Sequence, residues 1–413
     1  MTGLIARFSS VTNIQRHQLR VSGLVQGVGF RPFVYSLATS LGVLGWIKNT
    51  CQGVVIEVEG STDQLHQFQQ RLQRDKPLHA MIQQMEVTQL EPIGYTAFAI
   101  HHSDLSTANS DSQAQPAALI LPDLATCPAC LAELFDPGDR RYHYPLINCT
   151  HCGPRYSIVR SLPYDRSNTT MRSFPMCPQC QQEYDDPSDR RFHAQPTACS
   201  HCGPHLEFWN QQGQVLASHD EALQEAVAAI RQGKILAVKG LGGFHLIADA
   251  TNNAAVTALR QRKHRPHKPF AVMYPSLELL RDQCHVSNEE AELLESAIAP
   301  IVLIAIKNSQ QPFAIAPATN PGNPLLGVML PYTPLHHLLL RELGHPIIAT
   351  SGNLSGAPLC FDNQDALDKL GNIADGFLVH NRPIEQPVDD SIVRFVTLAT
   401  GENQPMILRR ARG

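Results

Sequence analysis

Eight of the eleven cysteines in this 413-residue sequence form four Cys-x-x-Cys pairs between residues 127 and 202. Two thiolates two residues apart can bind one side of a tetrahedral Zn²⁺, and a second pair completes the site. Redox motifs are the alternative, but four of them in so short a stretch would be unusual. We therefore predict two Zn²⁺ ions, both structural because four thiolates leave no open coordination position. The pairs are Cys127/Cys130, Cys149/Cys152, Cys177/Cys180 and Cys199/Cys202.

The cysteine-rich region is an internal duplication with a period of 50 residues. Cys127-Pro-Ala-Cys130 recurs as Cys177-Pro-Gln-Cys180. The sequence around Cys149/Cys152 recurs in the same way around Cys199/Cys202. The spacing within each copy is typical of a zinc ribbon, and we assign residues 118–205 to this unit. Each copy can hold its own ion, or the first and last pairs can share one. A unit of this size buries little apolar surface, and therefore the metal must supply much of its folding free energy.

A glycine-rich turn near the N-terminus has the composition of an anion site. Gly27 and Gly29 lie where a predicted strand meets a predicted helix, so backbone N–H groups can converge on an anion there. Arg31 adds a guanidinium that can bind a phosphate through two hydrogen bonds. Asn49 follows eighteen residues later, and its amide can position a water molecule. The alternatives are an ordinary turn and an ordinary strand-end asparagine.

A second set of polar residues lies in the C-terminal half. A glycine-rich turn, a cationic loop stiffened by prolines and a hydroxyl/amide turn together suit a polyphosphate or nucleotide. A solvated basic loop is the alternative for the cationic segment. The candidate nucleotide-binding residues here are Lys239, Gly240, Lys263, Arg265, Lys268, Ser351 and Asn353.

Hydrophobic periodicity indicates the elements that must position these residues. Residues 14–102 read β-α-β-β-α-β, which is the order of a ferredoxin-like sandwich. Residues 214–410 alternate helix and strand, which predicts one mixed α/β domain. The stretch Ser103–Pro116 is rich in Ser, Gln, Asn and Ala and is predicted to be a linker. In the α/β part we predict helices at 222–231, 254–262 and 336–343, and strands at 235–238, 301–306 and 346–350.

Composition excludes several classes of protein. Hydrophobic residues make up 43% and charged residues 17%, which is ordinary for a folded chain. The net charge of -4 argues against a globally basic nucleic-acid binder. No apolar run reaches the length of a membrane span, and no signal peptide is evident. We therefore expect no membrane association and a cytoplasmic location.

The first segment resembles the acylphosphatase family over residues 14–102, in both the glycine-rich turn and the later asparagine. The resemblance implies that Arg31 and the loop of Gln26, Gly27, Val28, Gly29 and Phe30 bind a phosphoryl group. It also implies that Asn49 orients the attacking water. Positioning and charge stabilisation alone can support such chemistry, because acyl phosphates have a good leaving group.

The C-terminal half resembles YrdC-like domains, which adenylate carbonate-type acids and are also associated with double-stranded RNA. The Lys263-x-Arg265-x-x-Lys268-Pro and Ser351-x-Asn353 motifs carry this resemblance, and Ser391 and Arg409 match its late positions. The chain departs from the tRNA-modifying members, because Lys239-Gly-Leu-Gly-Gly-Phe replaces their first motif. An RNA-binding or tRNA-modifying module is therefore kept as an alternative, as is a non-catalytic zinc scaffold.

The order of the three parts resembles the hydrogenase-maturation carbamoyltransferases of the HypF family. The resemblance implies an α+β and α/β multidomain enzyme: a ferredoxin-like acylphosphatase sandwich, a zinc-ribbon-like duplicated unit and a YrdC-like mixed α/β domain. Carbamoyl phosphate would be hydrolysed at the first site, and ATP with Mg²⁺ would adenylate the carbamate at the second. The family passes the carbamoyl group to a C-terminal Cys of a partner protein, for cyanide ligands of [NiFe]-hydrogenase. That family's last domain would begin where this sequence ends, so we expect a fragment, a truncated product or half of a split enzyme.

Overall fold

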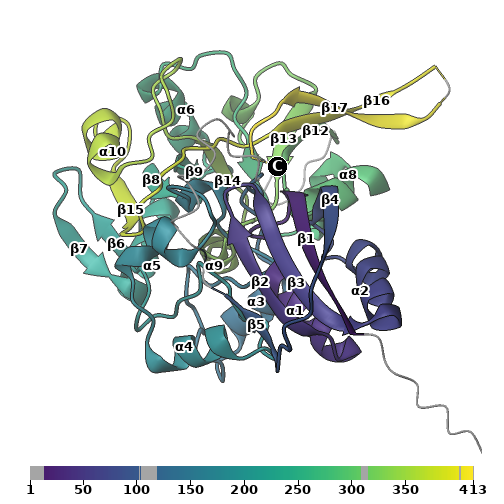
Figure 1. Ribbon diagram of the computed structural model, residues 1–413. Helices are drawn as coiled ribbons and strands as arrows, with labels where there is room; N and C mark the ends of the chain where they lie inside the picture. The colour runs from purple at the N-terminus through teal and green to yellow at the C-terminus, as the bar shows by residue number, and fades with distance from the viewer. Residues whose placement is uncertain (1–13, 102, 104–118, 308–314, 400, 413) are drawn as a thin grey trace, which may run out of the picture. The chain divides into compact units, whose positions relative to one another are not determined.

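The computed structural model describes residues 14–101, 103, 119–307, 315–399 and 401–412 (Figure 1). The chain divides into two compact units. The first contains Met1–Leu121, Ser161–Asp165 and Tyr184–Ala194, and the second contains Pro122–Arg160, Arg166–Glu183 and Gln195–Gly413. Apart from Ser103, the predicted linker lies outside the described residues. No helix of the described residues is long and apolar enough to cross a membrane.

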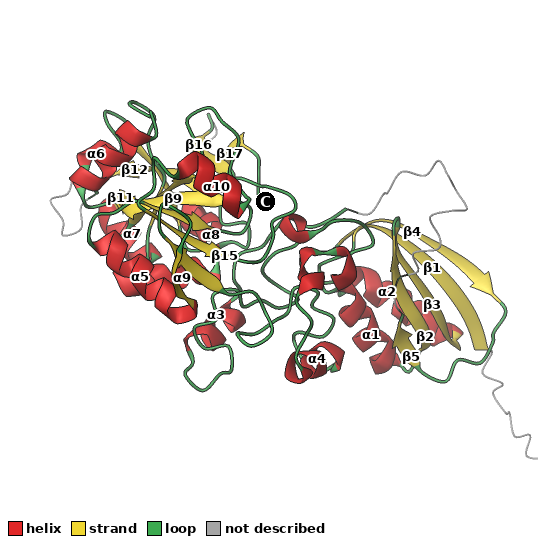
Figure 2. Ribbon diagram, turned by 90° about the vertical axis from the view of Figure 1, so that its left-hand side faces the viewer, coloured by secondary structure: helices red, strands yellow, loops and turns green. Residues whose placement is uncertain are grey.

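The first unit is the predicted β-α-β-β-α-β sandwich, and the predicted order is confirmed. Its five-stranded sheet has the order β4-β1-β3-β2-β5, and both helices cover one face of it (Figure 2). Leu65, Phe68 and Leu72 of the second helix are fully buried, as their spacing predicts, and Ser61 begins that helix with a capping box. The elements are β1 (Ile14–Leu24), α1 (Phe30–Leu41), β2 (Leu44–Thr50), β3 (Gly53–Ser61), α2 (Thr62–Arg74), β4 (Met81–Leu90) and the unpredicted β5 (Phe98–Ile100).

The duplicated region has the same local structure in both copies. Helices α3 (Pro128–Phe135) and α4 (Pro178–Asp185) each start at the proline after a cysteine, a position where the missing proline N–H costs nothing. After each helix, His143 and His193 adopt left-handed backbone angles with φ of 55° and 53°. Three short 3₁₀ helices follow α3: η2 (Tyr156–Ile158), η3 (Arg166–Asn168) and η4 (Thr170–Ser173).

The second unit is built on one large mixed sheet. The sheet has 12 strands in the order β17-β16-β12-β13-β10-β14-β9-β8-β15-β6-β7, and β11 pairs with β12. Its strands are β6 (Leu206–Trp209), β7 (Val215–Ser218), β8 (Leu236–Lys239), β9 (Phe244–Asp249), β10 (Val272–Met273), β11 (Cys284–His285), β12 (Ile301–Ile306), β13 (Leu325–Met329), β14 (Ile347–Ser351), β15 (Gly376–His380), β16 (Ile392–Thr397) and β17 (Asn403–Arg409). Its helices are α5 (His219–Arg231), α6 (Asn253–Arg262), α7 (Leu277–Gln283), α8 (Asn288–Glu295), η5 (Pro317–Thr319), α9 (Pro334–Leu343) and α10 (Asn363–Leu370).

The predicted helices and strands of the α/β part are confirmed, and the structure contains further strands and helices that were not predicted, among them the β6–β7 hairpin. The β6–β7 hairpin belongs to the large sheet although it begins before residue 214, where we place the start of this domain. Two apolar cores stabilise the sheet. One core contains side chains of α5 and α9, and the other contains side chains of α6, α7, α8 and α10. Cys130, Cys149 and Cys152 lie in the first core, so the first metal-binding motif is packed into the α/β part.

Candidate functional site

The eight paired cysteines form two separate clusters, one in each copy of the duplication. Each cluster brings its four sulfur atoms within 4.8 Å of one another. Neighbouring sulfurs lie 3.5–3.8 Å apart in the first cluster and 3.6–3.9 Å apart in the second. Four thiolates at about 2.3 Å from a tetrahedral Zn²⁺ would lie about 3.8 Å apart, whereas a disulfide requires about 2 Å. The geometry therefore fits a four-thiolate metal site, and each copy supplies all four sulfur atoms of its own cluster.

Buried arginines support both clusters. Arg155 donates to the carbonyl groups of Cys149 and Cys152, which holds the turn that carries these two ligands. Arg140 and Arg141 of the first copy reach the second cluster, where their Nη2 atoms lie 3.0 and 3.6 Å from the Cys180 sulfur. Hydrogen bonds to metal-bound thiolates stabilise their negative charge. The second cluster therefore depends on arginines from the first copy.

The glycine-rich loop of the first unit ends at the N-terminus of α1. Gly27 and Gly29 have φ of 73° and 74°, a left-handed conformation that side chains other than glycine rarely adopt. Gly29 is the N-cap residue of α1, and Arg31 lies in the first turn of that helix. Gln26 fixes the loop to the sheet, because its amide nitrogen donates to the carbonyl groups of Thr50 and Gly53 at 2.8 and 2.7 Å.

Arg31 and Asn49 converge on one point of the first unit. The Arg31 Nη2 and Asn49 Nδ2 atoms both donate to the carbonyl oxygen of Tyr164, at 3.4 and 3.2 Å. Arg31 also binds the Asp165 carboxylate at 2.6 Å. Both site side chains are buried, and the Asn49 Oδ1 atom has no hydrogen-bond partner among the residues that the structure describes. The segment Ser161–Asp165, which we call the strap, therefore uses the donors that a phosphoryl group would need.

The C-terminal candidate residues range from the buried Lys263 through half-buried side chains to the exposed Lys268. Lys263 is fully buried and donates to the Ser351 carbonyl, the Asn353 carbonyl and the Asn353 Oδ1 atom. Burial, reinforced by the charge of Arg265, lowers the pKa of Lys263 to about 7. The Ser351 hydroxyl donates to Asn353 Oδ1 at 2.7 Å. Lys263 therefore holds the hydroxyl/amide turn that the sequence pairs with it.

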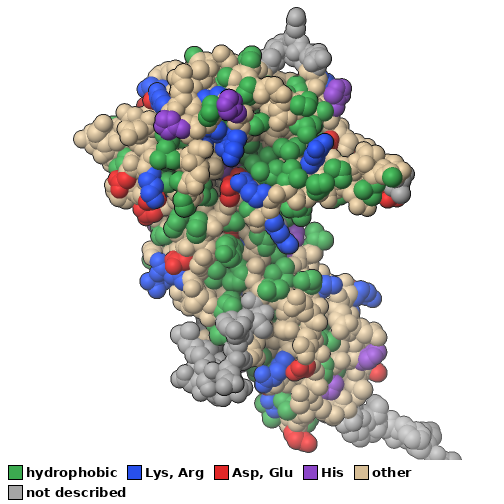
Figure 3. Space-filling model, turned by 90° about the horizontal axis from the view of Figure 1, so that it is seen from above, with side chains coloured by type: hydrophobic (Ala, Val, Ile, Leu, Met, Phe, Trp, Pro, Cys, Tyr) green, Lys and Arg blue, Asp and Glu red, His purple; other side chains and the backbone are tan. Residues whose placement is uncertain are grey.

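The cationic loop is held by an arginine that the prediction did not include. Arg260 donates to the carbonyl groups of Arg265 and Lys268 and stacks on Phe270, with 4.6 Å between its guanidinium and the ring centroid. Arg265 lies over the same ring at 5.5 Å, while the Lys268 side chain is exposed. On the face shown in Figure 3, Lys and Arg side chains border an area of hydrophobic side chains. The loop thus presents a fixed backbone and exposed cationic ends.

The two late residues that match the YrdC-like pattern lie beside acidic groups. Arg409 binds the Asp389 carboxylate at 2.8 Å, and the Ser391 hydroxyl donates to the Arg412 carbonyl at 2.7 Å. The charge of Arg409, after burial and Arg260, helps to lower the pKa of Arg265, so Arg409 lies close to the cationic loop.

The glycine-rich turn after β8 meets the same region through His245. The His245 Nε2 atom lies 3.0 Å from the Asp390 carboxylate, and His245 pairs with Ser351 across β9 and β14. Burial would raise the pKa of Asp390, but the hydrogen bond from His245 and the charge of Arg412 outweigh it and lower that pKa. The fold therefore brings the three predicted nucleotide-binding segments together at one end of adjacent strands.

Sequence reasoning missed the residues that complete these sites from a distance. Asp165 follows Arg31 by 134 positions, and Asp390 follows His245 by 145. Arg260 and His245 stand inside the predicted motifs, but no local pattern distinguishes a buried organising side chain from a solvated one. For Arg260 and His245 the available signal is chemical, because each is a charged or titratable residue within a predicted ligand-binding motif, whereas Asp165 carries no such signal.

Three protein families match successive parts of this chain. The acylphosphatase family matches residues 17–100, and the HypF finger family matches residues 126–159 and 176–209. The Sua5/YciO/YrdC family, described as telomere recombination, matches residues 228–411. Fold and site thus define a chain that joins an acylphosphatase fold and a YrdC-type α/β fold through two four-cysteine motifs.

Comparisons over nearly the whole length of this chain point to one family. The carbamoyltransferase HypF of Synechocystis sp. is 56% identical over 96% of this chain, and carbamoyltransferase HypF2 of Cupriavidus necator is 47% identical over 96%. A crystal structure of full-length HypF in the phosphate- and nucleotide-bound form matches with a TM-score of 0.89 and 43% identity, over 98% of this chain and 51% of that one. Over nearly its whole length the chain is similar to members of the HypF family. It spans about half the length of the relatives it matches, 49% and 50% of the two HypF sequences.

Proposed function

We propose that this chain carries out two consecutive reactions of carbamoyl transfer, in three parts: 14–102, 118–205 and 214–410. Carbamoyl phosphate and water give carbamate and phosphate at the first site. Carbamate and ATP then give carbamoyl adenylate and pyrophosphate at the second. The observation that carries this proposal is the meeting of Arg31 and Asn49 at the Tyr164 carbonyl, because two donors that are distant in sequence converge where a phosphoryl group and its attacking water would lie.

In the first reaction the chain supplies position and charge. The Arg31 guanidinium and the loop N–H groups of Gln26–Phe30 would bind the phosphoryl oxygens, where charge accumulates as the P–O bond breaks. The Asn49 amide would orient the water that attacks phosphorus. An amide is not a base, so the water proton leaves with the phosphate product. The Asp165 carboxylate that is bound to Arg31 supports the assignment of an anion to this guanidinium.

In the second reaction the carbamate oxygen attacks the α-phosphorus of ATP, and pyrophosphate leaves. Arg265, Lys268 and Arg409 would neutralise the phosphates, and Lys263 would hold the Ser351–Asn353 turn against them. Ser391, Lys239 and Gly240 complete the set that we assign to this site. Mg²⁺ would accompany the ATP phosphates and neutralise part of their charge.

We assign Zn²⁺ to both cysteine clusters, in a structural role. In the whole protein the carbamoyl group would pass to a partner protein with a C-terminal Cys, for cyanide ligand synthesis in [NiFe]-hydrogenase maturation. To the described residues we assign only hydrolysis and adenylation, in the cytoplasm.

One rescue experiment tests the two-site order. Arg31→Ala should abolish pyrophosphate release when carbamoyl phosphate is the substrate, because no carbamate reaches the second site. Bicarbonate with ammonium at high concentration should restore part of this release. Lys268→Ala should block pyrophosphate release from either source while acyl phosphate hydrolysis continues. If Arg31→Ala cannot be rescued although ATP binds, the sequential scheme is wrong.

A further inference from the structure

One buried carboxylate of the second unit, that of Asp390, joins side chains that lie far apart in the sequence. Asp390 is 4% exposed, and its two carboxylate oxygens have different partners. Oδ2 lies 3.0 Å from the His245 Nε2 atom, and Oδ1 accepts from the Arg412 Nη2 atom at 3.1 Å. A carboxylate only accepts, so the Nε2 atom of His245 carries the proton in this contact. His245 and Arg412 are themselves 7% and 2% exposed, so protein groups replace water around this charge.

The backbone carbonyl of Asp390 orients Arg409, one of the predicted nucleotide-binding residues. It accepts from the Arg409 Nε and Nη2 atoms at 3.2 and 2.8 Å. The Nη1 atom of Arg409 binds the Asp389 carboxylate at 2.8 Å, and both of these side chains are partly exposed. One edge of the guanidinium is therefore fixed by a buried residue, while its other side bears an anion at the protein surface. A phosphate oxygen can take the place of that anion and leave the fixed edge intact.

Residues 409–412 close around Asp390 and its neighbours. The hairpin of β16 and β17 (Figure 1) brings residues 389–391 beside them. The Arg412 backbone N–H donates to the Asp389 carbonyl at 3.0 Å, and the Ser391 hydroxyl donates to the Arg412 carbonyl at 2.7 Å. The Arg412 guanidinium also lies 3.8 Å from the centroid of the Tyr332 ring. Arg412 thus holds this segment through both its backbone and its side chain, and a shift of Asp390 would move Arg409.

The position of Asp390 distinguishes it from an ordinary structural ion pair. It directly precedes Ser391, and its carbonyl holds Arg409, so it contacts or adjoins both late nucleotide-binding candidates. Its partner His245 follows the glycine-rich turn and pairs with Ser351 across β9 and β14. Asp390 therefore connects all the strand ends that carry the predicted nucleotide-binding turns, although sequence reasoning did not place it in that set.

We propose that Asp390 is a positioning residue of the adenylating site, which sets the Arg409 guanidinium through its backbone carbonyl while His245 and Arg412 hold its carboxylate. The proposal rests on the function proposed above and adds to it three residues that act through Arg409 and do not touch ATP. A guanidinium that is already fixed binds phosphate without first losing side-chain freedom. Loosening this arrangement should therefore weaken ATP binding although no group that contacts ATP is removed.

A double-mutant cycle on ATP binding tests this route. The Kd for ATP with Mg²⁺ is measured by calorimetry on the metal-loaded chain. His245→Leu and Arg409→Ala should each raise the Kd about tenfold, since each removes a hydrogen bond to a charged group. In the Arg409→Ala background, His245→Leu should change the Kd by less than about twofold, because the residue through which it acts is gone. His245→Gln keeps an N–H donor for Asp390 and should stay within about threefold of the parent.

Two arginine variants support the same test. Arg412→Gln weakens the other support of the carboxylate and should repeat the pattern of His245→Leu in both backgrounds. It provides a second route to the result if His245→Leu does not fold. Arg410→Gln is the matched control, because Arg410 is an exposed neighbour of both Arg409 and Arg412. Its Kd for ATP should equal that of the parent.

Additive effects overturn the positioning role. If His245→Leu weakens ATP binding by the same factor with and without Arg409, His245 acts on the nucleotide directly or on the fold as a whole. Equal losses in His245→Gln and His245→Leu overturn it as well, since the glutamine keeps the donor. A parent that binds no ATP contradicts the proposed adenylation and removes the role of Arg409 with it. A parent that binds ATP, with an Arg409→Ala variant that binds it equally well, contradicts only the positioning role.

Discussion

Replacing Asp165 with Asn should make the acyl phosphate site bind its substrate more tightly. The Asp165 carboxylate lies 2.6 Å from the Arg31 guanidinium, and the two side chains are 20% and 8% exposed. A substrate phosphoryl group and this carboxylate require the same donor. Substrate therefore binds only the fraction of molecules in which the strap has released Arg31, and the apparent affinity falls by that fraction.

The size of the effect follows from the strength of this contact. A hydrogen bond to a charged group contributes about 1.5–3 kcal/mol, which corresponds to about 10- to 150-fold in an equilibrium constant. Asn keeps the shape and a neutral acceptor, so part of the contact remains. We therefore expect Asp165→Asn to lower the KM for acyl phosphate about tenfold, with kcat unchanged within about twofold.

Benzoyl phosphate hydrolysis measures both constants, and inhibition by inorganic phosphate gives an independent reading. The inhibition constant for phosphate should fall in parallel with the KM. Asp63→Asn is the matched control, because Asp63 is exposed at the start of α2. The reasoning is refuted if the KM does not fall, or if kcat drops more than tenfold, since Asp165 would then hold Arg31 in its working orientation.

Three further substitutions probe the other parts. Asn49→Ala should lower kcat for acyl phosphate about 10²- to 10³-fold with little change in KM, as steady-state kinetics will show, because only the attacking water loses its partner. Arg141→Leu should cost about 1–3 kcal/mol in the free energy of unfolding measured with urea. It should also speed release of one metal ion to a chelator, because Arg141 contacts both Glu183 and Cys180. Arg260→Leu should raise the Kd for ATP in calorimetry about tenfold through loss of the loop's backbone anchors.

The local sequence pattern was sufficient to predict those strands and helices whose apolar residues recur at a regular spacing. The alternation in β3 and the helical spacing of α2 each predict a buried face, and both faces are found, although Glu57 and Glu59 on the other side of β3 are buried as well. The β6–β7 hairpin was not predicted, because each of its strands has only four residues. The side chains of β7 are also largely exposed to solvent. Four residues carry too little periodicity to distinguish a strand from a loop.

The candidate sites divide in the same way. The cysteine clusters are readable because their spacing is itself the chemical signal. The Arg31/Asn49 pair was proposed through the resemblance to the acylphosphatase family and not through spacing alone. The strap is not readable, since Asp165 reaches Arg31 only through a fold in which residues 161–165 leave the duplicated region and join the first unit. Nothing in the composition of Leu162–Asp165 distinguishes it from an ordinary loop.

Removal of both metal ions should destabilise the α/β half as well as the duplicated region. Structural zinc sites contribute several kcal/mol or more of folding free energy. The first cluster does not have a separate core, because Cys130, Cys149 and Cys152 pack in the same apolar cluster as Leu223 of α5 and Leu339 of α9. Loss of the ion would leave these thiolates repelling one another inside that core, so the two regions should unfold together.

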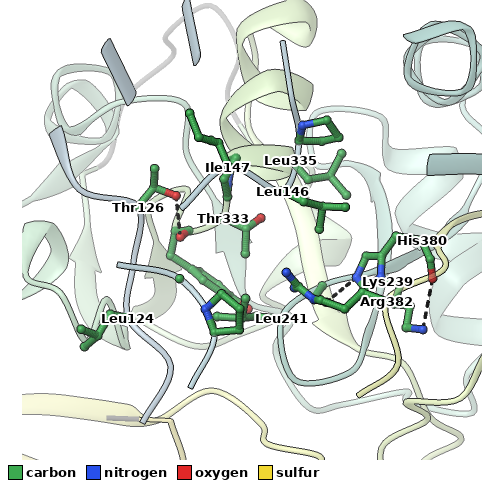
Figure 4. A pocket seen from close by; sticks show the side chains of 16 residues that line it. Leu124, Thr126, Leu146, Ile147, Lys239, Leu241, Thr333, Leu335, His380 and Arg382 are labelled. Carbon is green, nitrogen blue, oxygen red and sulfur yellow. Dashed lines mark hydrogen bonds between the residues drawn. The ribbon is translucent and has the colours of Figure 1, made fainter. Parts of the chain in front are cut away.

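The measurement is thermal unfolding before and after chelation, with ATP binding as the reporter of the α/β half. We expect one transition that moves to lower temperature, a parallel loss of ATP binding, and recovery of both on addition of Zn²⁺. A chelated chain that binds ATP normally and keeps its upper transition would show that the α/β half folds without the metal. The shared core would then be a contact between independent parts, as is the pocket that Leu146 and Ile147 of the duplicated unit line together with Lys239 (Figure 4).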